Sequence, residues 1–208
     1  GGKISIEKGK NEIRLRDLTG FEGRCDAIVF STNKDLIAPF EKNELNSLRK
    51  KSLGFPKTPM NAGEFDLVVV GGGVAGMSAS LSAARLGLNV ALIQNRPVLG
   101  GNNSSEIRVH QSSDINIEPF PEIGDITKEI DSKNPKWESG DIRHYGKQTD
   151  LGKLELILNE PNISLFLEMH VYDAVVENGK IQKIFAKDIR TGEEFAFKGK
   201  LFSDCTGD

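Results

Sequence analysis

The chain contains one stretch that decides its fold, Asp66-Leu67-Val68-Val69-Val70-Gly71-Gly72-Gly73-Val74-Ala75-Gly76. Its first half is aliphatic on both faces, which is typical of a buried strand in a parallel sheet. Its second half matches the glycine pattern G-x-G-x-x-G, with Gly71, Gly73 and Gly76 in the three fixed places. The first glycine permits a tight turn, the second lets the backbone approach a pyrophosphate, and the third lets a helix pack closely on the strand.

The residues after the glycine turn predict a helix and then a second strand. Ala75 to Leu86 is rich in Ala, Ser, Met and Leu, with apolar residues at helical spacing, and Gly87 is placed to end the helix. Asn89 to Ile93 is a second apolar run. This order predicts an α/β, Rossmann-like domain with a parallel sheet. The start of its first helix, Val74 and Ala75 included, would offer backbone N–H groups to an anion.

The end of the second predicted strand departs from the dinucleotide-binding pattern. That pattern expects an acidic residue about twenty positions on, for the ribose hydroxyls, and Gln94 stands there. An amide still hydrogen-bonds a hydroxyl, though less strongly than a carboxylate. We therefore expect Gln94 to hold the ribose, and Gln94→Glu to tighten cofactor binding by about 1 kcal/mol. Arg96 is suited to a 2′-phosphate, which leaves NADP open as an alternative ligand.

Two further motifs lie behind this unit. The loop after the second predicted strand reads Arg96-Pro97-Val98-Leu99-Gly100-Gly101-Asn102-Asn103-Ser104-Ser105-Glu106-Ile107-Arg108-Val109, and the last residues read Asp204-Cys205-Thr206-Gly207-Asp208. With these motifs, residues 65–208 resemble FAD-dependent oxidoreductases of the glutathione-reductase-like superfamily. The loop is most similar to a bacterial family motif, Arg-Pro-x-Leu-Gly-Gly-Asn-x-Ser-Ser-Glu-Ile-Arg-Val. The second motif resembles an Asp-x-Thr-Gly-Asp sequence at the end of a sheet strand in that family.

The resemblance implies FAD as cofactor and hydride transfer through its isoalloxazine to or from a small-molecule substrate. It places both motifs beside the pyrophosphate and ribityl chain, and Val171 beside the adenine through its backbone. It also implies that later parts of the same polypeptide build the substrate side, so that this portion is inactive alone, and no catalytic acid or base is assigned. The expected cofactor-binding residues are Gly71, Gly73, Val74, Ala75, Gly76, Gln94, Asn95, Arg96, Gly100, Gly101, Asn102, Val171, Thr206, Gly207 and Asp208.

Other interpretations stay open at this point. An NAD(P)-binding dehydrogenase would share the glycine turn but has no reason to carry the other two motifs. A Rossmann scaffold without catalytic function is a further alternative, given Gln94.

Between the motifs, the pattern predicts a helix over 150–158, a strand over 163–167 and a meander of strands over 171–177, 180–189 and 194–197. The polar stretch from Asp125 to Gln148 is long for a loop, so we expect it to be functional or partly disordered.

The first forty residues predict a separate β-rich segment, with short alternating runs at Ile4 to Ile6 and Ile13 to Arg16. Gly9 to Leu15 and Asp26 to Phe30 resemble the last strands of galactose-binding-like β-sandwich modules. The alternative is a β extension packed on the next domain. A sandwich would make a saccharide substrate, or a non-catalytic carbohydrate-associated module, plausible. Residues 41–64, which are polar and contain proline and glycine, are predicted to be a linker to the domain over 65–208.

Composition removes several classes of function. The 208 residues include 27 basic and 30 acidic side chains, for a net charge of −3, which argues against a nucleic-acid partner. The longest apolar stretch is broken by glycines, so no membrane span is expected. Cys25 and Cys205 form no C-x-x-C, and the three histidines lack ligand spacing, so no metal site is expected. Gly1-Gly2 has no initiator Met, so we expect the native start upstream, and compartment and secretory signal stay open.

Overall fold

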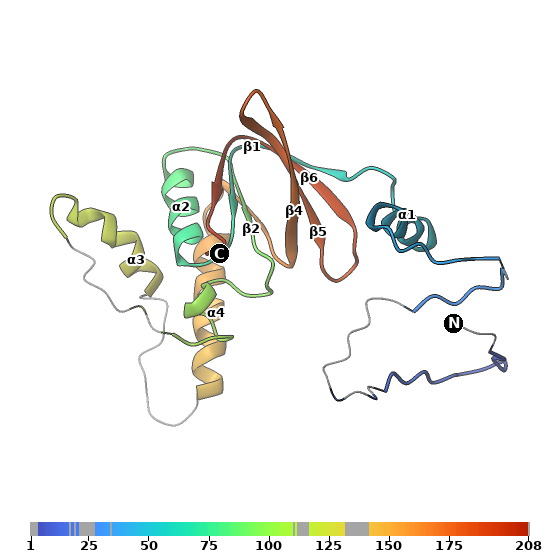
Figure 1. Cartoon of the computed structure of the whole chain (residues 1–208). Coiled ribbons are helices and arrows are strands. Elements are labelled where there is room, and N and C mark those ends of the chain that lie inside the picture. The colour runs from blue at the N-terminus through green and yellow to red at the C-terminus, as the bar shows by residue number, and fades with distance from the viewer. Residues whose placement is uncertain are drawn as a thin grey trace. The chain divides into compact units, whose positions relative to one another are not determined.

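The computed structural model describes residues 4–16, 18, 20, 28–33, 35–109, 111, 117–131 and 142–207. The chain divides into two units, residues 1–49 and residues 50–208. The second unit contains a six-stranded sheet with helices (Figure 1). None of the helices in the described residues is long and apolar enough to cross a bilayer.

The described residues before Phe40 form no strand, so the alternating runs at Ile4 to Ile6 and Ile13 to Arg16 were misleading. The apolar side chains of these two runs are more than half exposed: Ile4 is 63% and Leu15 is 69% exposed. Short strands need a partner and a face to bury, and the described residues before Phe40 provide neither. Part of the Asp26 to Phe30 run lies outside the described residues, and the sandwich interpretation stays a prediction.

Residues 41–64 contain regular structure where a linker was expected. Helix α1 spans Lys42–Leu53, and strand β1 spans Met60–Val70, so it begins well before the apolar run. The early part of β1 pairs in parallel with β6 (Glu194–Asp204), with Met60 opposite Phe195. Its polar residues are therefore in a strand because of a partner far away in the sequence. The division into domains itself stays a prediction.

The other strands are β2 (Val90–Ile93), β3 (Ile163–Phe166), β4 (Met169–Glu177) and β5 (Lys180–Asp188). The sheet has the strand order β3-β2-β1-β6-β5-β4, in which the first four strands are parallel and β6, β5 and β4 are antiparallel. This confirms the α/β fold and the meander. One detail was wrong, because the strand predicted over 194–197 continues as far as Asp204, where the last motif begins. At Gly199, in the middle of β6, a Cβ would lie 2.8 Å from Val68 Cγ2, so β6 lies close against a side chain of β1 there.

The helix after the glycine turn is confirmed, and it ends at a glycine as expected: Gly87 has φ +88° and donates its N–H to Ala84 O. The stretch from Asp125 to Gln148 contains helix at both ends, which the loop prediction missed. The helices of the second unit are α2 (Val74–Arg85), α3 (Gly124–Asp131) and α4 (Ile142–Leu158), with short 3₁₀ turns η1 (Gly101–Asn103) and η2 (Pro121–Ile123).

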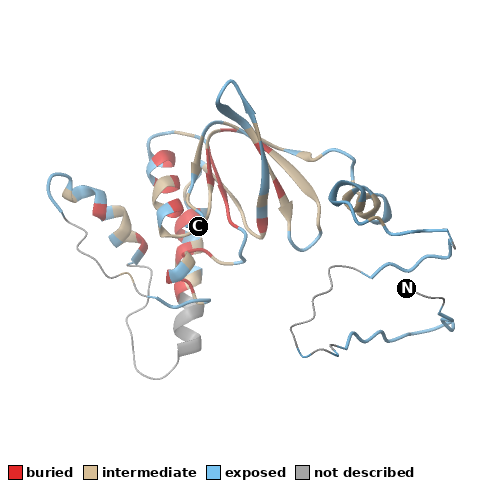
Figure 2. Ribbon diagram, viewed as in Figure 1, coloured by how far each residue is buried: buried red, intermediate tan, exposed pale blue. Residues whose placement is uncertain are grey.

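Two apolar layers cover the two faces of the parallel strands. On one face, Val69 and Leu92 pack with Met77 and Leu81 of α2 and with residues of α3 and α4. On the other face, aromatic residues join β1 and β3 to the meander, and the rings of Phe166 and Phe197 meet edge to face at 4.8 Å. The most deeply buried segments are β2 and the inner side of α2 (Figure 2). With both faces covered, the carboxyl ends of β1, β2 and β6 remain available at one edge.

Candidate functional site

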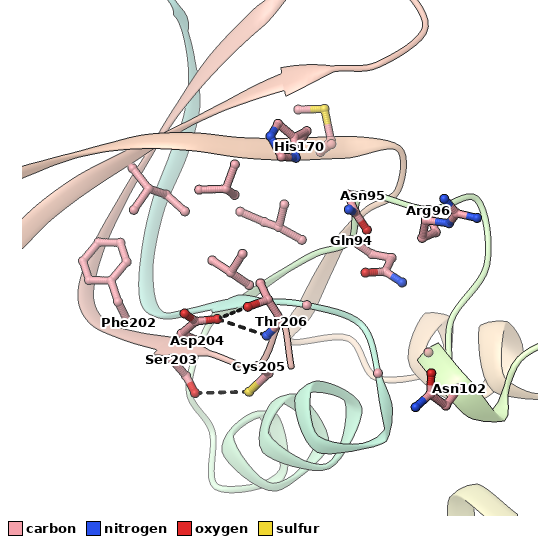
Figure 3. Close-up of a pocket in the computed structure, with 18 of the residues that line it drawn as sticks. Gln94, Asn95, Arg96, Asn102, His170, Phe202, Ser203, Asp204, Cys205 and Thr206 are labelled. Atoms are coloured by element: carbon pink, nitrogen blue, oxygen red, sulfur yellow. Dashed lines mark hydrogen bonds between the residues drawn. The ribbon is translucent and has the colours of Figure 1, made fainter. Parts of the chain in front are cut away.

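A cleft of about 800 Å³ opens at this edge, a size within the range of small-molecule sites (Figure 3). It is lined by residues from β1, β2, β6, the meander and the loop after β2. Nine of the residues predicted from the sequence line it: Gly71, Gly73, Gln94, Asn95, Arg96, Gly101, Asn102, Val171 and Thr206.

The three glycines of the turn have different surroundings. Gly71 has φ +102°, and a Cβ there would lie 2.4 Å from the carbonyl oxygen of Cys205. A Cβ at Gly76 would lie 1.8 Å from the carbonyl oxygen of Gly71. Gly71 and Gly76 are therefore needed for close backbone packing. A Cβ on Gly73 would have nothing within 4 Å, and this residue faces the cleft.

The first turn of α2 begins at this open position. Gly73 is the N-cap residue, and no side chain caps the helix. The first helical bond runs from Met77 N–H to Gly73 O. The preceding N–H groups and the positive end of the helix dipole make this end suited to an anion.

The loop of Gly100 and Gly101 lies directly on the turn. Gly100 donates its N–H to Gly72 O at 2.8 Å, and a Cβ on Gly101 would lie 3.2 Å from Gly73 Cα. Gly101 and Asn102 face the cleft, whereas Gly100 lies behind them. The two glycine-rich segments therefore form one continuous wall.

The end of β6 completes this edge. Cys205 donates its N–H to Val70 O at 2.7 Å, which holds the last motif beside the glycine turn. The Asp204 carboxylate accepts hydrogen bonds from the N–H and the hydroxyl of Thr206, and these bonds lower the pKa of Asp204. Thr206 lines the cleft, Gly207 is not among its lining residues, and Asp208 lies outside the described residues.

Gln94 differs from its expected role. It is only 6% exposed, its Oε1 accepts the N–H of Gly72 at 3.0 Å, and its Nε2 donates to Val98 O at 3.2 Å. Both ends of the amide are thus used within the chain. The side chain holds the glycine turn in place, and in this geometry its amide is not directed toward the expected ribose contact.

Arg96 also has a partner. Its guanidinium forms a two-fold hydrogen bond with Glu106, Nε to Oε2 at 2.8 Å and Nη2 to Oε1 at 2.9 Å. This hydrogen bonding raises the pKa of Arg96. Both residues line the cleft, so the guanidinium that was considered for a 2′-phosphate is already paired with a carboxylate.

The apolar side of the cleft was missed from the sequence. Ile181 and Ile184 of β5 and Phe202 of β6 line it, and His170 of β4 lies on the opposite side from Thr206 (Figure 3). The alternating pattern of the meander strands was the available signal, but it does not show which face of these strands lines the cleft. The remaining unpredicted lining residues are Val70, Ile93, Glu106, Ile107, Met169, Ser203, Asp204 and Cys205.

Two of the three histidines lie where the structure describes no side chain. His110 lies outside the described residues, and no side-chain placement is described for His144. In the described part of the chain, no group of three His, Cys, Asp or Glu side chains is arranged to hold a metal.

Comparison with known proteins identifies the family. The sequence model of the FAD dependent oxidoreductase family matches residues 66–208. The chain belongs to this family. Its cofactor is accordingly FAD, and the cleft fits that group: the open space at Gly73, the uncapped helix end and the glycine-rich wall suit a pyrophosphate.

Two relatives illustrate the match. A soluble pyridine nucleotide transhydrogenase from Ectopseudomonas mendocina is 28% identical over 143 residues, which are 60% of this chain and 29% of that protein. The chain therefore spans less than a third of the length of that relative. Among solved structures, Sdh1 of Mycobacterium smegmatis in complex with UQ1 is 15% identical with a TM-score of 0.51. That match covers 70% of this chain and 34% of the other, and it shows a shared fold.

Proposed function

We propose that the cleft binds FAD along the edge of the sheet and that the chain is the FAD-binding part of a flavin oxidoreductase acting on a small molecule. One observation carries this proposal. The glycine turn, the Gly100–Asn102 loop and the end of β6 are far apart in the sequence. A backbone hydrogen bond of 2.8 Å nevertheless joins the loop to the turn, and one of 2.7 Å joins the end of β6 to Val70, directly before the turn. A single elongated ligand suits such a site, because each segment contributes a short part of one wall.

The roles follow from position along the wall. Gly73, with the N–H groups of Val74 and Ala75, would hold the pyrophosphate, while Gly76 lets α2 approach the strand. Gly101 and Asn102 would contact the neighbouring part of the cofactor. We extend the proposal to the last motif, in which Thr206, Gly207 and Asp208 would contact the ribityl part of the cofactor. Asn95, Arg96 and Val171 would contact its adenosine part. Gly100 supports this wall from behind, and Gln94, which itself lines the cleft, holds the glycine turn through its hydrogen bond with Gly72.

When bound, FAD supplies hydride transfer through its isoalloxazine. The described residues bind and orient it, and the apolar side chains of Ile184 and Phe202 exclude water from one side of the cleft. No described residue is assigned as a catalytic acid or base. The coverage of only 29% of the transhydrogenase relative supports the view that further chain completes the substrate side.

The test is to identify and titrate the cofactor. We expect the purified protein to be yellow, with absorbance at about 450 nm, and mass spectrometry of the released ligand to give the mass of FAD. Apoprotein should bind FAD with a stoichiometry of one, and NADP⁺ should not compete. A protein that takes up NADP⁺ or NAD⁺ but no flavin would contradict the proposal.

A further inference from the structure

The loop of the cofactor wall is held from behind by charged residues of α4, which no motif includes. Lys153 is fully buried, and its Nζ donates to the carbonyl oxygen of Asn103 at 2.8 Å. One turn earlier, the carboxylate of Asp150 accepts the N–H of Ser105 at 2.9 Å. The two side chains therefore bind one carbonyl and one N–H of the same loop.

Packing adds to these hydrogen bonds. At Gly100, where φ is +106°, a Cβ would lie 3.0 Å from Cδ and 3.1 Å from Cε of Lys153. The aliphatic stem of the lysine thus lies against the back of the loop, and the front of the loop lies on Gly73. Any displacement of the stem would change the position of Gly101 relative to the turn.

Burying a lysine is costly unless the ammonium has polar partners. Burial lowers the pKa of Lys153 to about 8, although the nearby Asp150 and Asp131 act in the opposite direction. An apolar residue of similar length would fill the same space without this cost. A lysine at this position is therefore poorly explained by stability alone.

We propose that Asp150 and Lys153 are a positioning pair that holds the Gly100–Ser105 loop in the position, relative to the glycine turn, that the cofactor requires. Neither residue lines the cleft, so they act through the loop and not by contact with the ligand. This inference rests on the proposed function, since it assumes that FAD lies along that wall.

The first test needs no cofactor. Hydrogen exchange of the amides in the Gly100–Ser105 loop is measured in the full-length apoprotein and in Lys153→Met, which keeps the stem and removes the donor. We expect loop exchange to accelerate about tenfold while the rest of the sheet exchanges unchanged, because one charged hydrogen bond is lost. Lys128→Met, at an exposed position of α3, is the matched control and should have no effect.

The second test measures FAD affinity. We expect Lys153→Met to raise the Kd about tenfold without lowering the melting temperature, a combination that a purely structural role would not produce. Asp150→Ala should also raise the Kd, whereas Asp150→Asn, which keeps an acceptor for Ser105, should restore it to within about twofold. If Lys153→Met does not fold, the comparison of Asp150→Ala with Asp150→Asn decides whether the positioning role holds.

The outcomes are distinct. Unchanged loop exchange in both Lys153→Met and Asp150→Ala would overturn the positioning role. Faster loop exchange with unchanged affinity, in a wild type that binds FAD, would overturn its connection to the cofactor. A wild type that takes up no FAD would overturn the proposed function and this role together, while the hydrogen-exchange result would still report how the loop is held.

Discussion

Gly73 and Gly76 belong to the same glycine motif, and the structure predicts opposite consequences when each gains a methyl group. In Gly76→Ala, the new Cβ would lie 1.8 Å from the carbonyl oxygen of Gly71, an atom that can move only with the backbone of the turn. Overpacking typically costs about 1–3 kcal/mol. Because this contact is with backbone, we expect the free energy of unfolding to fall by about 3 kcal/mol or more.

In Gly73→Ala, the methyl group has no neighbour within 4 Å. Replacing glycine stabilises by about 0.4–1 kcal/mol through the unfolded chain. Losing glycine at an N-cap costs about 0.5 kcal/mol. These effects nearly cancel, so stability should change by less than about 0.5 kcal/mol. The methyl would nevertheless occupy space assigned to the pyrophosphate, so the Kd for FAD should rise about tenfold or more, and further in Gly73→Val.

The assay pairs urea denaturation of each apoprotein, followed by circular dichroism, with titration of FAD followed by flavin fluorescence. The two variants should separate, one losing stability and the other losing affinity. If Gly73→Val binds FAD as the wild type does, the pyrophosphate does not lie against Gly73. If Gly76→Ala is as stable as the wild type, the close approach between α2 and the turn is not as described.

Three further predictions concern side chains that support the site. Gln94→Glu should lower the free energy of unfolding by about 1–3 kcal/mol, since it loses the donor to a backbone carbonyl, and should not tighten FAD binding; tighter binding in the titration would restore the ribose role. Urea denaturation at pH 8 and pH 9 should show that the free energy of unfolding of the wild type rises by about 1 kcal/mol relative to Lys153→Met. Over this interval Lys153, with a pKa of about 8, releases its proton in the folded protein but keeps it in the unfolded chain, and a difference independent of pH would contradict this. Arg85→Met should cost about 1 kcal/mol at low salt and less in 1 M NaCl, because Arg85 pairs with both Glu129 and Glu160 at a partly exposed site; equal losses at both salt concentrations would argue that packing dominates.

What could be predicted from the sequence was local. The strand, glycine turn and helix around Gly71 and Gly76 follow from neighbouring residues whose geometry requires glycine, and the structure has them there. The two distant motifs could be placed near the turn only through the family resemblance. Spacing alone does not show that Cys205 pairs with Val70.

What failed depended on partners remote in sequence. The alternating run at Ile4 to Ile6 has the period of a strand but no strand partner among the described residues. Met60 and Asn61 look like part of a linker, yet they are in a strand because β6 lies beside them.

The same lesson applies to the candidate site. The spacing of Gln94 matched a ribose ligand, but the nearby N–H of Gly72, 22 positions away, uses that side chain. Lys153 carries no signal at all in the sequence, since a lysine on a helix is ordinarily a surface residue.

The pairing of β6 with β1 has a consequence for how the protein is made. During synthesis, β1, both glycine-rich segments and β3 leave the ribosome before β6, so the nascent domain has an open edge on its central strand. Contacts between residues so distant in sequence form late, because a long loop must close first. The wall that Cys205 and Thr206 contribute is thus added only after the glycine turn and the loop on it have been made, and the three segments of the cleft come together only when β6 has docked beside β1.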